Sequence, residues 1–287
     1  MGFRTVVVTT HSKLEYSLNY LVYRTTDEVK RINIGEIQTL IIESTAVSIT
    51  SALLNELIKQ KIKVIFCDEK KNPSCELMSY YGDVISSKRI NEQINWHYDT
   101  KQYVWKLIIE EKIKKQAEVM KLVPKEDSIL ISNFSFDVLP GDTSNREGHA
   151  AKMYFNRVFG NDFTRNGNNP INVYLNYGYS LILSQFNKYI VSKGYLTQLG
   201  IHHKSEFNQF NLSCDLMEPF RAIVDRKALY LNDDNFKDEL IKMLSDIVII
   251  AEQKQTISNA IGIYCNSIFS ALNTGDVTKI KFYSFYE

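Results

Sequence analysis

Short runs of β-branched and aromatic residues alternate with polar turns through the first 70 residues of the chain. This pattern is typical of β-strands, and the expected strands are residues 5–9, 18–23, 28–33, 39–43 and 63–67. Over residues 48–61, leucine and isoleucine recur at helical spacing with lysine and glutamine on the other face. The N-terminal part is therefore expected to be rich in strands and to contain one helix.

The pattern changes to helical spacing from residue 88 onward. Residues 88–122 contain no glycine or proline, and an apolar face is supplied by Trp105, Ile108, Ile109 and Ile113. This segment is locally basic, with Lys112, Lys114, Lys115 and Lys121. Further helices are expected over residues 147–159, 171–193, 218–230 and 235–268, with Pro170 placed to begin the second of them.

A charged break that ends in a proline, residues 68–73, separates the two patterns. The sequence thus predicts an α+β protein with a small β-rich N-terminal domain at residues 1–72, a hinge at residues 73–87 and a larger all-α domain at residues 88–287. The N-terminal strands carry apolar side chains that are expected to be exposed, at Tyr20, Val22 and Tyr23. A small sheet gains by packing against its copy, so this domain is expected to form a homodimer contact.

Composition excludes several classes of protein. The chain has 287 residues and is 44% hydrophobic, enough for a sizeable core. A net charge of +1 argues against a uniformly basic nucleic-acid binder, although a local basic surface would suffice. The four cysteines form no CxxC pair, which favours reduced thiols in a cytoplasmic protein. No apolar run approaches the roughly 18 residues of a membrane span, and no secretory signal is expected.

One segment, residues 200–221, concentrates residues with catalytic chemistry. It places a histidine pair in a glycine-led turn and follows it with Asp215 and Glu218. Upstream, Glu147 lies in the first turn of an expected helix. One imidazole and two carboxylates suit Mg²⁺ or Mn²⁺ better than a structural zinc, which prefers thiolates or several imidazoles. Such a metal commonly acts on phosphate esters.

Each of these residues also has a structural interpretation. A carboxylate at a helix start is often a cap, and a histidine pair after a glycine is often a surface turn. Arg146 and Arg221 flank two of the acids, where they could bind phosphate or form plain ion pairs. The tyrosines at residues 174–179 could stack on bases or pack in the core. Pro219 is expected to hold Glu218 outside the helical region, at a boundary where Pro219 lies in the first turn of a new helix.

Four motifs together carry a family resemblance. They are Arg-Glu-Gly-x-Ala-Ala-x-x-Tyr at residues 146–154, residues 169–183 with Asn-Pro-Ile-Asn and Leu-Asn-Tyr-Gly-Tyr, Gly-x-x-His at 200–203, and Asp-Leu-Met-Glu-Pro-Phe-Arg at 215–221. In this combination the chain resembles the CRISPR spacer-acquisition integrase family, the universal adaptation nuclease of CRISPR systems, and in particular its type II branch. The resemblance covers nearly the whole length, because the family also has a β-rich N-terminal domain followed by a helical one.

The resemblance implies a set of site residues and a reaction. The metal ligands would be Glu147, His203 and Glu218, holding Mg²⁺ or Mn²⁺, with Asp215 supporting the site. Between His202 and His203, the family's spacing from its glycine favours His203. The implied reaction is metal-dependent DNA integration, in which the 3′-hydroxyl of a prespacer attacks a phosphodiester at the edge of the CRISPR repeat.

The resemblance also implies partners. The family works as a homodimer, two of which clamp a dimer of a small ferredoxin-like protein in a heterohexamer, with prespacer and repeat or leader DNA lying across it. Other type II CRISPR proteins are possible further partners. Two other functions remain open from the residues alone: a non-catalytic DNA-binding scaffold and a stand-alone metal nuclease on branched DNA. The scaffold predicts that changing Glu147 leaves every DNA reaction intact, whereas the nuclease predicts hydrolysis without strand joining.

Overall fold

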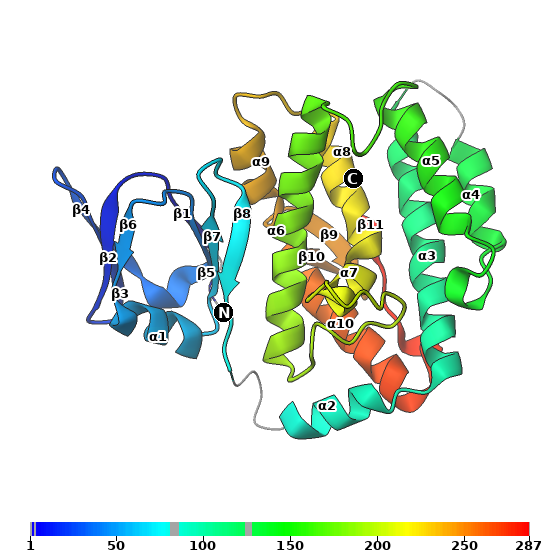
Figure 1. Ribbon diagram of the computed structural model, residues 1–287, viewed down its shortest axis with the longest axis horizontal. Helices are drawn as coiled ribbons and strands as arrows, with labels where there is room; N and C mark the ends of the chain where they lie inside the picture. Colours follow the sequence, from blue (N-terminus) through cyan, green and yellow to red (C-terminus); the bar gives the residue numbers. More distant parts are fainter. Residues whose placement is uncertain (1, 3, 81–85, 124–127, 287) are drawn as a thin grey trace. The chain divides into compact units, whose positions relative to one another are not determined.

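The computed structural model describes residues 2, 4–80, 86–123 and 128–286, and the chain divides into two compact units, residues 1–82 and 83–287. The first unit is β-rich and the second is mostly helical (Figure 1). The α+β class predicted from the sequence is therefore confirmed. Residues 81–85 of the predicted hinge lie outside the described residues.

Among its described residues, the first unit contains two four-stranded sheets and one α-helix. In one sheet the order is β1 (Arg4–Val8), β5 (Ile37–Ile42), β7 (Lys63–Cys67) and β8 (Pro73–Leu77), the first three parallel and β8 antiparallel. In the other the order is β4 (Val29–Asn33), β3 (Tyr20–Arg24), β2 (Ser12–Ser17) and β6 (Val47–Ile49). The helix α1 (Ser51–Lys59) buries Leu53 and Leu57 in a core shared with both sheets. The central strand β5 is buried almost throughout, as expected for a parallel strand with neighbours on both sides.

The predicted hinge is wrong at its start, because residues 73–77 form strand β8. The turn before it is the charged segment, in which the Asp68 carboxylate accepts the backbone N–H groups of Lys70 and Asn72 at 2.9 and 2.8 Å. Pro73 is tolerated because it opens an edge strand. A buried ion pair between Lys63 of β7 and Glu76 of β8 connects the two strands.

The predicted apolar dimer face is also wrong in part. Val22 is only 1% exposed and belongs to the core, whereas Tyr20 is 38% exposed. Tyr23 is partly buried, and its hydroxyl lies 2.7 Å from that of Thr10. The strand predicted over residues 18–23 begins two residues too early. Leu18, at φ 49°, belongs to the turn that joins β2 to β3. The residue that remains exposed from the predicted face is Tyr20.

The described part of the second unit contains two long helices, α3 (Tyr98–Met120) and α6 (Pro170–Ser192) (Figure 1). The others are α2 (Ser86–Ile94), α4 (Ser128–Phe136), α5 (Arg146–Phe159), α7 (Asn211–Met217), α8 (Arg221–Ala228), α9 (Phe236–Met243) and α10 (Ile257–Thr274). Of these, α8 and α10 contact both of the long helices. Short 3₁₀ turns lie at η1 (Ile34–Glu36) in the first unit and at η2 (Pro140–Asp142), η3 (Glu218–Phe220) and η4 (Val277–Lys279) here. The apolar face predicted for α3 is fully buried, including Trp105 and Ile109, and α3 packs against α4, α5, α8 and η3.

The second unit is not all-α as predicted, because it contains a three-stranded antiparallel sheet. Its order is β10 (Gln253–Thr256), β9 (Ile247–Ile250) and β11 (Tyr283–Phe285). The single helix expected over residues 235–268 is instead α9, the β9–β10 hairpin and α10. The hairpin turn is made by Ala251 and Glu252 at φ 51° and 63°, a conformation usually taken by Asn or Gly, so the sequence carried no turn signal.

In the part of the chain that the structure describes, none of the helices combines the length and the apolar character needed to cross a bilayer.

Candidate functional site

Glu147 lies in the first turn of α5 but does not cap it. The N-cap residue, Asn145, makes no side-chain cap, and the Asp142 carboxylate instead accepts the N–H groups of Arg146 and Glu147 at 2.8 and 3.0 Å. The Glu147 carboxylate is therefore available for another partner, and its Oε1 accepts a hydrogen bond from Lys112 Nζ at 2.5 Å. The capping interpretation consequently does not account for this residue.

Glu218 lies in η3, directly between α7 and α8. Its φ of −51° and ψ of −46° are helical, so the expectation that Pro219 would hold it outside the helical region is wrong. The expectation that Pro219 lies in the first turn of a new helix is confirmed. The steric bias before proline is outweighed here, because Met217 and Phe220 on either side are buried in the core.

The Glu218 carboxylate accepts hydrogen bonds from two cations, Lys112 Nζ at 2.5 Å and Arg221 Nε at 3.0 Å. Burial would raise the pKa of Glu218, but Arg221 and Lys112 together lower that pKa to about 2. Burial would lower the pKa of Lys112, yet the charges of Glu218 and Glu147 raise it. Since the Glu147 and Glu218 oxygens are each 2.5 Å from the same nitrogen, they lie no more than 5.0 Å apart.

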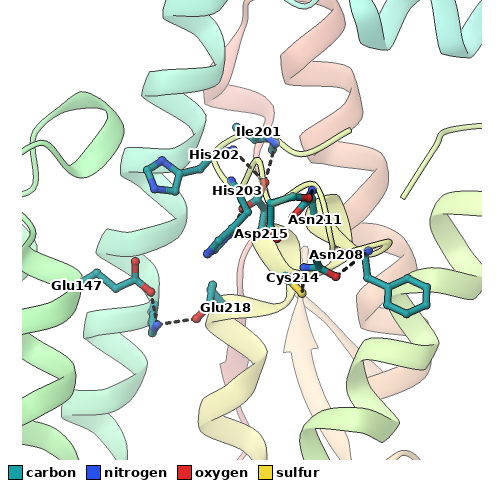
Figure 2. A network of polar contacts seen from close by, with 12 residues as sticks. Glu147, Ile201, His202, His203, Asn208, Asn211, Cys214, Asp215 and Glu218 are labelled. Atoms are coloured by element: carbon teal, nitrogen blue, oxygen red, sulfur yellow. Dashed lines mark hydrogen bonds and ion pairs between the residues drawn. The ribbon is translucent and has the colours of Figure 1, made fainter. Parts of the chain in front are cut away.

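Asp215 organises the histidine loop from a fully buried position on α7. Its Oδ2 accepts the N–H groups of Ile201 and His202 at 2.6 and 2.9 Å, and its Oδ1 accepts the N–H of His203 at 3.1 Å (Figure 2). The same Oδ1 accepts a hydrogen bond from His203 Nδ1 at 2.5 Å. This leaves Nε2 of a neutral His203 as a lone-pair donor, the arrangement that metal-ligating histidines commonly have.

The glycine of the Gly-x-x-His motif is needed for this close packing. A Cβ atom on Gly200 would lie 2.4 Å from the carbonyl oxygen of His203 and 2.7 Å from Oδ2 of Asp215. Asp215 cannot move away without breaking the hydrogen bonds that its Oδ2 accepts from Ile201 and His202. The spacing seen in the sequence therefore has a steric cause.

The two histidines have different surroundings. His202 stacks on Trp105, with ring centroids 4.4 Å apart and planes at 2°, and burial lowers its pKa. The hydrogen bond to Asp215 raises the pKa of His203, against the effect of burial. Figure 2 shows the His203 ring directed from the loop toward Glu218, whereas the His202 ring projects to the left of the loop.

The donor types suit a hard divalent cation. Two carboxylates share one small volume, and His203 presents a ring whose Nδ1 is already engaged by Asp215. Of the residues that the structure describes, no three His, Cys, Asp or Glu side chains are already assembled as a metal-binding group. The Lys112 ammonium lies between the two carboxylates instead. The chemistry of these residues therefore fits Mg²⁺ or Mn²⁺, provided that Lys112 moves.

A pocket of about 250 Å³ opens beside the two carboxylates. Arg221 lines it and lies over the Tyr179 ring, 4.7 Å from its centroid, and Arg165 lies 5.3 Å from the same centroid. Beneath them the buried Asp225 accepts hydrogen bonds from the hydroxyls of Tyr154 and Tyr179 at 2.9 and 2.5 Å. Burial raises the pKa of Asp225 to about 6. Both arginines are thus held at the pocket wall by an aromatic ring that is itself anchored.

The sequence interpretation did not identify Lys112, Gln116, Arg165 and Asp225 as parts of a site, and it considered Tyr179 only as one of several tyrosines that could stack on bases or pack in the core. The sequence signal that could have linked Lys112 to Gln116 is their spacing of four residues on α3, which places both side chains on one face of the helix. Arg146 is not among the residues that line the pocket. It lies instead 3.8 Å from the Asp137 carboxylate and 5.9 Å from the centroid of Phe134.

Acid should destabilise this site. The pKa of Glu218 is about 2, below its ordinary value of 4.5, so its ion pairs stabilise the fold above pH 4.5 and are lost as the pH falls from 4.5 toward 2. Between pH 6 and pH 3, we expect wild-type protein in chelator to lose about 2 kcal/mol more free energy of unfolding than Glu218→Gln. Denaturant titrations at both pH values measure this difference, and equal losses in the two proteins would contradict it.

A family comparison and a relative of known name both relate this chain to the same group of proteins. Residues 6–135 and 142–260 match the family described as CRISPR associated protein Cas1. The CRISPR-associated endonuclease Cas1 of Neisseria meningitidis serogroup C (strain 8013) is 28% identical over 291 residues, which cover 98% of this chain and 96% of that protein. The second matched span, residues 142–260, contains Glu147, His203 and Glu218.

Solved structures share the fold. A casposase bound to integration product has a TM-score of 0.78 at 19% identity, covering 96% of this chain and 92% of that one. A chain of a Cas6-RT-Cas1–Cas2 complex has a TM-score of 0.75 at 16% identity, covering 96% of this chain and 36% of that one. At such identities the likeness establishes the fold alone.

Proposed function

This chain belongs to the CRISPR associated protein Cas1 family, and we propose that it is a metal-dependent DNA integrase and endonuclease of CRISPR adaptation. The observation that carries the proposal is the position of Glu147 and Glu218. Both carboxylates bind the Lys112 ammonium, and they lie beside His203. A relative named as an endonuclease and a casposase bound to integration product support this class of reaction. Membership of the type II branch remains a prediction.

In this proposal the chain's own residues prepare the site. Glu147, His203 and Glu218 would hold Mg²⁺ or Mn²⁺, and Asp215 keeps His203 in the tautomer that presents Nε2. When bound, such an ion lowers the pKa of an attacking hydroxyl and neutralises charge that develops on the phosphate. Arg221, held by Tyr179 and Glu218, is placed to orient a phosphate in the pocket.

The reaction we propose is a transesterification. The 3′-hydroxyl oxygen of a prespacer forms a new bond to a phosphorus atom at the edge of the CRISPR repeat, and the existing P–O bond to the repeat strand breaks. The leaving oxygen takes up a proton and becomes a free 3′-hydroxyl. Joining of a labelled prespacer to a repeat-bearing plasmid, with and without Mn²⁺, tests this activity directly.

The assembly is also a proposal. We expect a homodimer formed through the N-terminal unit, two of which bind a dimer of a small ferredoxin-like partner. A Cas6-RT-Cas1–Cas2 complex among the proteins of similar fold supports a partner of this kind. Repetition of a local basic surface across such an assembly would let a chain of net charge +1 bind DNA.

The two arginines of the motifs should behave differently in DNA binding. Arg221→Met should weaken binding and lower the slope of log affinity against log salt concentration by about 1, because one phosphate contact is lost. Arg146→Met should change the slope less, since Arg146 lies against Asp137 and Phe134. Gel shifts over a salt series measure both slopes. Equal slopes for Arg221→Met and wild type would show that Arg221 does not contact phosphate.

A further inference from the structure

Lys112 is a pocket residue that the proposed reaction leaves without a role. It comes from the middle of α3, and its side chain is 11% exposed. Its ammonium donates to Glu147 Oε1 and to Glu218 Oε2, at 2.5 Å each. Without a cation between them, two carboxylates this close would repel each other. Lys112 therefore holds the two acids together in the metal-free protein.

The same two oxygens are also candidate ligands for a divalent ion. Mg²⁺ binds oxygen at about 2.0–2.1 Å and larger ions at up to about 2.6 Å, so an ion that bridged these carboxylates would fall close to the position of the Lys112 nitrogen. Ammonium and metal cannot both occupy that position. The second cation at Glu218, Arg221, binds the other oxygen, Oε1, and does not meet this conflict. An ion that used these two oxygens would therefore require Lys112 to leave.

Gln116 offers the departing ammonium a new partner. It lies one helical turn after Lys112 on α3, lines the same pocket and is only 3% exposed. Its Oε1 is buried and has no hydrogen-bond partner among the described residues. A buried amide oxygen without a donor is unfavourable, and a lysine on the preceding turn has the reach and the flexibility to donate to it.

We propose that Lys112 is a tethered cation that competes with the divalent ion for Glu147 and Glu218 and moves to Gln116 Oε1 when the ion binds. Lys112 thereby sets the metal affinity of the site. The inference rests on the proposed function, since it assumes that the two carboxylates are metal ligands. It makes Lys112 and Gln116 positioning residues, with effects on metal binding that can be measured without DNA.

Calorimetric titration of the chelator-treated full chain with MnCl₂ tests the inference. Lys112→Met should bind Mn²⁺ at least about tenfold more tightly than wild type, because the competing charge is gone. Lys114→Met, an exposed lysine two residues along α3, should bind as wild type does. Gln116→Leu should bind more weakly, since the displaced ammonium loses its acceptor. In the Lys112→Met background, Gln116→Leu should have no effect, and this coupling is the signature of the exchange.

Thermal melting adds a second readout. Lys112→Met should melt at a lower temperature than wild type without metal and show a larger rise in melting temperature with Mn²⁺. If Lys112→Met does not fold, Lys112→Gln and the Gln116→Leu titration still decide the question. Binding by Lys112→Met or Lys112→Gln that is no tighter than wild type overturns the inference alone. Equal Mn²⁺ binding by wild type and Glu147→Gln overturns the metal site of the proposed function as well.

Discussion

Glu147→Ala is expected to lower the rate of metal-dependent strand joining by several powers of ten while leaving DNA affinity nearly unchanged. The change removes one of the two carboxylates that flank Lys112, and with it a proposed metal ligand. A loss on the order of 4 kcal/mol or more of transition-state stabilisation corresponds to a rate about a thousandfold lower. Affinity depends on many phosphate contacts to which this carboxylate does not contribute.

The measurement joins a labelled prespacer to a repeat-bearing plasmid, beside a gel shift on the same DNA. Glu110→Ala is a matched control, because Glu110 is a partly buried acid that pairs with Lys106 at 3.5 Å. Glu147→Gln keeps the shape of the side chain and should lose joining as well. Wild-type joining by the Glu147 variants would favour the DNA-binding scaffold. Metal-dependent hydrolysis by wild type without joining would favour the stand-alone nuclease.

Asp215→Ala should have the second largest effect, and it should act on the fold as well as on activity. Four hydrogen bonds end on this buried carboxylate, three of them from the backbone of the histidine loop. Leaving these donors without an acceptor should lower the free energy of unfolding by on the order of 4 kcal/mol. Protein that still folds should have lost strand joining, because His203 is no longer oriented.

Asp142→Ala provides the comparison for this prediction. Asp142 also accepts two backbone N–H groups, but it is partly exposed and caps a single helix. Its loss should lower the free energy of unfolding by only about 1–2 kcal/mol. Denaturant titrations of the two variants give both values. If Asp215→Ala is no less stable than Asp142→Ala, the carboxylate does not organise the loop as described.

The site was predictable from sequence only as far as residue chemistry is distinctive. Glu147, His203 and Glu218 stood out because carboxylates and imidazoles in motifs indicate metal chemistry. Lys112 did not, because its partners are 35 and 106 residues away and α3 carries several other lysines. A contact between residues so far apart in the chain is formed by tertiary packing, so no local sequence pattern predicts it.

The β9–β10 hairpin is a second feature that local sequence could not predict. Isoleucine and valine at residues 247–250 suit a strand or a buried helix, and their flanks carried helical spacing. The strand assignment depends on pairing with β10 and also with β11, whose residues lie 33 to 37 positions after their partners in β9. By contrast, α5 and α6 begin within one residue of their predicted starts, because their N-terminal signals and apolar faces are local.

The most direct test of the account is the position of Mn²⁺ in crystals of the metal-loaded protein, located by anomalous scattering. The account predicts one ion within about 2.0–2.6 Å of carboxylate oxygens of both Glu147 and Glu218 and at a similar distance from Nε2 of His203. An ion bound elsewhere, or no ion at these three residues in crystals saturated with Mn²⁺, would contradict it.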